Sequence, residues 1–146
     1  MKAQFKELRL KQLGRSLAAF KKAQGTPRPK RGWLRAIREA TGLSLTNVGK
    51  AIGATRSHVQ ALEKSEADER ITLRSLKKVA AAMNCELVYA IVPKSGTLGG
   101  LVEKRAYQAA ATRVRAVEHT MALEDQAAGG VREKIEEEAR RILKRS

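Results

Sequence analysis

The apolar residues at the start of the chain follow a helical period. Within residues 3–23 they recur three or four positions apart, from Leu10 to Phe20, among lysines and arginines. This spacing predicts an amphipathic helix. Such a basic helix can also lie on a membrane surface, but the stripe is short and a basic linker follows, so we expect no membrane contact. The glycines and prolines of GTPRPKRG, residues 25–32, end the helix and form an arm.

Four short helices are predicted next, because each apolar run begins after a capping residue or ends at a glycine. They start at or just after Trp33, Ser44, Thr55 and Thr72. Two longer helices are predicted at residues 98–127 and 131–145, on either side of an AAGG break.

The period changes at residues 85–94, CELVYAIVPK, where β-branched and aromatic residues accumulate before Pro93. This composition predicts a β-strand. A single strand leaves its backbone groups unpaired, so it has to pair with the N-terminal region or with another chain. Pairing with its own copy would make a homodimer. An extended tail packed on the helices is an equally good interpretation of the same residues.

The helices that follow Ser44 and Thr55 have the spacing of a helix-turn-helix. Val48 and Val59 fall on their inner faces. Gly49 falls where the two helices cross, and a small residue there permits close approach. Gly53 falls at the turn, where a positive φ costs glycine little.

Polar side chains gather in the first turn of the helix after Thr55, within GATRSHVQALEKSE. In a helix-turn-helix this turn enters the major groove, where Arg can pair with guanine and Gln with adenine. We expect Arg56 and Gln60 to read base edges, and Lys50 and Lys64 to contact phosphates. The predicted DNA contacts are Thr55, Arg56, Ser57, His58, Gln60, Asn47, Lys50 and Lys64.

The charge of the chain supports a nucleic-acid partner. Lys and Arg number 30 against 15 Asp and Glu, which gives a formal net charge of +15. Residues 1–40 carry 12 basic and 2 acidic side chains, so we expect the arm at residues 21–31 to add phosphate contacts. A surplus of this size favours polyanions.

Other functional classes find little support. The single cysteine, Cys85, excludes an intramolecular disulfide, and there is no charged-then-apolar leader, so we predict a cytoplasmic protein. No phosphate-binding Gly-rich loop and no nucleophile–base pair is evident. We therefore expect no enzyme, no cofactor and no metal site.

Residues 42–65, GLSLTNVGKAIGATRSHVQALEKS, resemble the helix-turn-helix of the lambda-repressor-like, or Xre, regulators. The family pattern of capping residue, small residue, turn glycine and late glutamate falls here on Ser44, Gly49, Gly53 and Glu63. Many members have a phosphate-contacting Gln where this chain has Leu45, and Asn47 or Lys50 can take over that contact.

A wider resemblance covers most of the chain. The stretches PRPKRGWLRAIREATGLSL, LEKSEADERITLRSLKKVAAAMNCELVYAIVP and VEHTMALEDQA look like the family called mobile mystery protein A. Members are typically encoded beside a Fic-domain protein, and Fic enzymes transfer AMP from ATP to protein hydroxyls. The resemblance implies an antitoxin and repressor paired with a Fic-domain toxin.

The same resemblance directs attention to TMALED, residues 120–125. Fic inhibitors carry a helix with the pattern Ser/Thr-x-x-x-Glu-Gly/Asn, whose glutamate excludes the ATP γ-phosphate. Thr120 and Glu124 match it and share one helix face, whereas Asp125 departs from it. An exposed glutamate on an amphipathic helix is the alternative interpretation.

The fold class predicted is mainly α: a lambda-repressor-like helix-turn-helix domain with one β-strand and C-terminal helices. We expect a basic helix and arm at residues 1–31, the DNA-binding domain with its strand at 32–94, and a C-terminal helical region at 95–146 that is a candidate toxin-binding segment. The predicted function is a dimeric antitoxin that binds a double-stranded operator. A stand-alone phage-type repressor and a nonspecific nucleic-acid scaffold are the alternatives.

Overall fold

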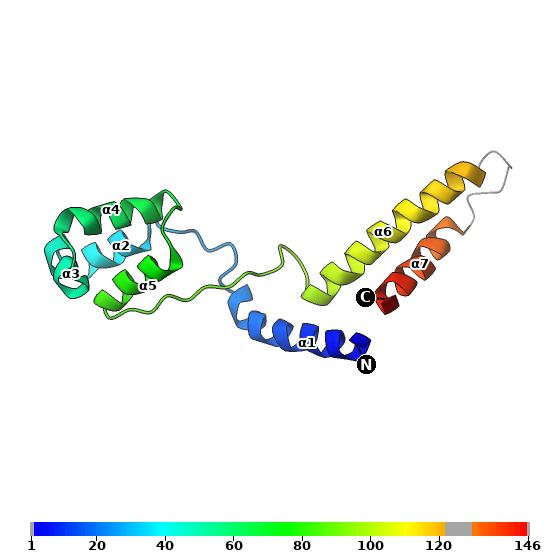
Figure 1. Ribbon diagram of the computed structural model, residues 1–146, viewed down its shortest axis with the longest axis horizontal. Coiled ribbons are helices and arrows are strands. Elements are labelled where there is room, and N and C mark those ends of the chain that lie inside the picture. Colours follow the sequence, from blue (N-terminus) through cyan, green and yellow to red (C-terminus); the bar gives the residue numbers. More distant parts are fainter. Residues whose placement is uncertain (1, 122–129, 146) are drawn as a thin grey trace. The chain divides into compact units, whose positions relative to one another are not determined.

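Helices dominate the part of the chain that the computed structural model describes, which is residues 2–121 and 130–145 without the side chains of residues 118–121. Seven helices lie in these residues (Figure 1). Their bounds are α1 Lys2–Lys21, α2 Trp33–Ala40, α3 Leu45–Ile52, α4 Arg56–Ala67, α5 Leu73–Ala82, α6 Leu98–Met121 and α7 Val131–Arg145. The helical part of the predicted fold class is therefore confirmed.

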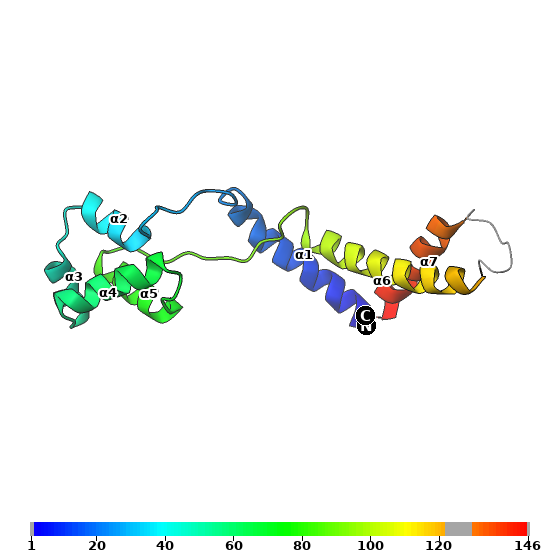
Figure 2. The same cartoon turned by 90° about the horizontal axis from the view of Figure 1, so that it is seen from above.

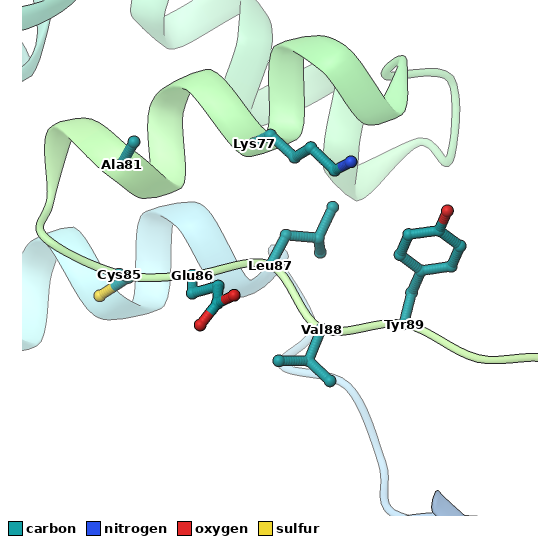
Figure 3. A pocket seen from close by; sticks show the side chains of 7 residues that line it. All are labelled: Lys77, Ala81, Cys85, Glu86, Leu87, Val88 and Tyr89. Atoms are coloured by element: carbon teal, nitrogen blue, oxygen red, sulfur yellow. The ribbon is translucent and has the colours of Figure 1, made fainter. Parts of the chain in front are cut away.

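The predicted β-strand is wrong. Residues 85–93 have no regular secondary structure, and none of the residues described here forms a strand. The side chains of this segment still alternate, because Leu87 and Tyr89 point toward α5 while Val88 points away (Figure 3). The β-favouring composition gives an extended backbone, but a strand also needs a neighbouring backbone to bond. The helices around this segment provide none.

Two compact units divide the chain. The central unit is residues 25–89, and the terminal unit is residues 1–24 together with 90–146. The central unit is thus inserted between α1 and α6, so the terminal unit is built from both ends of the sequence.

The terminal unit is organised by the pair α6 and α7, which lie side by side in both views (Figure 2). Alanines at the contact, such as Ala106, Ala110 and Ala139, let the two helices approach closely around Ile135. Helix α1 contacts α6 but buries none of its residues completely. Its predicted apolar stripe, from Leu10 to Phe20, is therefore only partly covered.

The central unit has its own apolar core. Helices α2, α3, α4 and α5 each contribute one buried residue to the apolar cluster, and the end of α5 adds a fifth: Leu34, Val48, Val59, Val79 and Met83. Every helix of the unit is therefore fixed by burial of apolar surface.

Two buried carboxylates of α4 hold α2 against this core. Glu66 is 5% exposed and accepts hydrogen bonds from the backbone N–H groups of Trp33 (2.9 Å) and Leu34 (2.8 Å). It thereby caps the first turn of α2, where backbone donors have no partner within the helix. One turn earlier, Glu63 forms a two-pronged ion pair with Arg38, with N–O distances of 2.8 and 2.9 Å. The hydrogen bond that the Glu63 carboxylate accepts from Arg38 raises the pKa of the Arg38 guanidinium.

We predict that Glu66→Gln destabilises the central unit by about 1–3 kcal/mol, because an amide offers one acceptor where the carboxylate offers two and leaves a buried N–H unpaired. The single tryptophan, Trp33, lies in this unit, so its fluorescence during denaturant unfolding measures the effect. Glu69→Gln is the matched control, since its side chain is 80% exposed in a surface pair, and should change stability by less than about 0.5 kcal/mol. Equal effects of the two substitutions would contradict the capping role.

Candidate nucleic-acid interface

The turn between α3 and α4 is tight, and two glycines make it possible. Gly53 ends α3 with a φ of 69°, in the left-handed region. A Cβ atom at Gly49 would lie 2.6 Å from the carbonyl oxygen of Ala54, a distance that no side chain could occupy. The close approach predicted at Gly49 is present, and its partner is the backbone that enters α4.

Hydroxyl caps fix where α3 and α4 begin. The hydroxyl of Ser44 accepts from the backbone N–H of Asn47, and the Asn47 side chain accepts from the backbone N–H of Ser44, which is a capping box. The hydroxyl of Thr55 accepts from the backbone N–H of His58 at 3.1 Å. The oxygens of Thr55 and Asn47 are thus committed to local structure, whereas the amide N–H groups of Asn47 remain donors toward solvent.

Helix α4 presents an exposed polar face opposite its buried one. Val59 is 0% exposed and Leu62 packs against the same core. The side chains of this helix that we predict to contact DNA are all exposed: Arg56, Ser57, His58, Gln60 and Lys64. Lys50 and Asn47, on α3, are exposed as well. The first turn of α4 is therefore free to enter a groove of DNA.

Two hollows flank this face. One, of about 520 Å³, is lined by Ser57, Gln60 and Lys64 of α4 together with Arg31 and Arg35. The other, of about 460 Å³, lies on the α5 side. It is lined by Ile52, Gly53, Ala54, Thr55, His58, Leu62, Ser75 and Lys78. Of the predicted contacts, Ser57, Gln60 and Lys64 thus line one hollow and Thr55 and His58 the other, whereas Arg56 lines neither.

The sequence does not single out Arg35 or Lys78. Arg35 belongs to α2 and Lys78 to α5, so neither lies within the helix-turn-helix stretch itself. Arg35 and Arg38 fall three positions apart on α2, and this spacing indicates one basic face, which Arg31 adjoins just before the Gly32 N-cap of the helix. Only the packing of α2 on α4 brings that face beside Gln60.

Glu39 pairs with the arginines of this basic face. Its carboxylate accepts a hydrogen bond from Arg35 at 2.8 Å and lies 3.9 Å from a terminal nitrogen of Arg38. The hydrogen bond from Arg35 holds the pKa of Glu39 below its usual value, and the charges of Arg35, Arg38 and Arg31 act in the same direction. Because Arg38 is already paired with the buried Glu63, the positive potential at this edge of α4 comes mainly from Arg31 and Arg35.

The structure does not test the prediction that Thr120 and Glu124 inhibit a toxin. Thr120 falls within the bounds of α6, its side chain is not described, and Glu124 lies outside the described residues. Among the residues that the structure does describe, no group of three or more His, Cys, Asp and Glu side chains could hold a metal ion. In the same residues no helix is long and apolar enough to cross a membrane.

A comparison with protein families matches residues 34–89 to the helix-turn-helix family model. The match spans α2 to α5 and thus the four helices of the central unit. No curated protein and no solved structure matches the chain. Residues 34–89 are therefore a helix-turn-helix domain of the lambda-repressor-like, or Xre, type.

Proposed function

We propose that this protein is a sequence-specific DNA-binding repressor that reads its operator with α4. The observation that carries the proposal is the first turn of α4, where exposed polar side chains stand on a helix fixed by Val59 and by the cap at Thr55. Such a turn can enter the major groove without exposing apolar surface to it.

The roles of the side chains follow from their chemistry. Arg56 and Gln60 can each make two hydrogen bonds to a base edge, Arg to guanine and Gln to adenine. Ser57 and His58 are more permissive donors and acceptors. Lys64, together with Lys50 and the Asn47 amide on α3, supplies phosphate contacts that set the position of the helix but carry no sequence information.

We predict that Arg56→Ala weakens operator binding by about 1–3 kcal/mol and relaxes the preference at one base position. Lys64→Ala is the control, because loss of a phosphate contact weakens binding to all sequences alike and lowers the salt slope by about 0.9. Binding of each variant to a randomised duplex library distinguishes the two patterns. If Arg56→Ala weakened every sequence equally, Arg56 would be a phosphate contact.

We also propose that the DNA-binding form is a homodimer. Val88 and Tyr89, at the end of the central unit, are 67 and 58% exposed, and adjacent exposed apolar side chains of this kind mark an interaction site. A groove of about 560 Å³ runs between this segment and α5, with Lys77 and Ala81 on one wall and Leu87 and Tyr89 on the other (Figure 3). Side chains of a second copy can bury this apolar surface.

Replacing Val88 by Ser should weaken self-association by about 1.5 kcal/mol, since a buried aliphatic side chain contributes roughly that much. Sedimentation equilibrium measures the change, and Leu73→Ser, at a 48% exposed residue of the same unit, should leave it unaltered. The wild-type footprint should show two half-sites about 34 Å apart. A monomeric wild type with a single, non-palindromic footprint would contradict the dimer.

A Fic-domain toxin is the partner that we propose for the terminal unit. The proposal rests on the resemblance to mobile mystery protein A and is supported by the terminal unit having a core of its own around Ile135. In this proposal the carboxylate of Glu124 pairs with an arginine of the toxin and takes the place of the ATP γ-phosphate. The alternative, a stand-alone phage-type repressor, predicts no such partner.

We predict that Glu124→Gly restores AMP transfer by the toxin while the two proteins still bind each other and operator affinity is unchanged. The assay follows transfer from labelled ATP by the product of a neighbouring Fic-domain gene. Thr120→Ala should have a milder effect, because it removes no charge. Full inhibition by the Glu124→Gly protein would show that this glutamate is not the inhibitory group.

A further inference from the structure

We infer that Arg31 and Arg35 form a phosphate-binding site for the DNA strand beside α4, and that Glu39 occupies Arg35 until DNA displaces it. The inference rests on the proposed DNA binding by α4 and adds a positioning site on α2 and the arm. The ligand is a backbone phosphate of the duplex whose major groove α4 enters.

The first observation is the position of the two arginines. Both line the same hollow as Ser57, Gln60 and Lys64. When Gln60 lies in the major groove, the sugar–phosphate backbone that borders the groove has to pass along one side of α4. Arg31 and Arg35 form the wall of the hollow on that side.

The second observation is that the backbone on both sides of Arg31 is fastened to α4. Arg28 donates to the carbonyl oxygens of Glu66 (2.8 Å) and Ala67 (3.2 Å) at the end of α4. On the other side, the N–H of Trp33 donates to the Glu66 carboxylate at 2.9 Å. The segment with Arg31 is thus fastened to α4 both before and after this residue. Because the backbone of this segment is set in advance, little backbone entropy is lost when Arg31 binds a phosphate.

The third observation is the ion pair of Arg35. Its Nε lies 2.8 Å from a carboxylate oxygen of Glu39, and the two side chains are 39% and 55% exposed. An exposed pair of this kind contributes little to stability, so it can be exchanged. A phosphate can accept two hydrogen bonds from the planar guanidinium, as a carboxylate does. Glu39 therefore acts as an internal competitor for the phosphate.

The test is the salt dependence of operator binding by the full chain. We expect Arg35→Ala to lower the slope of log affinity against log salt by about 0.9 and Arg31→Ala,Arg35→Ala by about 1.8. When salt rises from roughly 50 to 200 mM, the affinity of the wild type falls, and for each lost contact the corresponding fall for the variant should be about 3.5-fold smaller. The base preference of the variant should not change. Glu39→Gln should bind more tightly than wild type at low salt, because the competitor has lost its charge.

Arg132→Ala is the matched control, since Arg132 also pairs with a glutamate four residues later, in the terminal unit. It makes the same change of net charge and should leave the slope unaltered. A slope lowered equally by Arg132→Ala and Arg35→Ala would overturn the inference, because only net charge would then matter. A slope that Arg35→Ala leaves unchanged would overturn it as well. A wild type that binds no duplex would instead refute the proposed function.

Discussion

The hydrogen bonds of Glu66 are the contacts on which the arrangement of the DNA-binding unit depends. Its buried carboxylate accepts the first two backbone N–H groups of α2, and its own carbonyl accepts from Arg28. A buried carboxylate without partners is costly, so α2 and the arm have to dock where these donors are available. This docking sets the distance between Arg35 and the exposed face of α4, and it leaves the first turn of α4 uncovered.

Some of the basic side chains of the arm and of α2 are bound within the fold. The arm and α2 are strongly basic, yet Arg28 of the arm binds the end of α4 and Arg38 of α2 binds Glu63. Both are therefore structural cations in the free protein, whereas Arg31 remains beside α4. A basic sequence thus overstates the number of phosphate contacts, because part of its charge stabilises the fold.

Local signals in the sequence were sufficient to predict the helices. The helix ends at Ser44, Thr55 and Gly53 are set by contacts with nearby residues, and such contacts can be predicted from the spacing of the sequence. Glu63 and Glu66 carry no local sign of burial, because their partners lie 25 to 33 residues away. The strand at residues 85–94 was predicted from composition alone and is wrong, since pairing depends on a neighbouring backbone that the composition does not specify. The exposed face of α4 could be predicted from its period, whereas the wall formed by Arg31 and Arg35 depends on tertiary packing.

The central claim is that α4 reads DNA from the major groove, and methylation interference tests it most directly. An operator selected from random duplexes would be methylated sparsely with dimethyl sulfate, which modifies guanine N7 in the major groove and adenine N3 in the minor groove. The account predicts that methylation of guanine N7 within the footprint prevents binding, because Arg56 needs that acceptor. Interference confined to adenine N3, or spread evenly over the duplex, would contradict it.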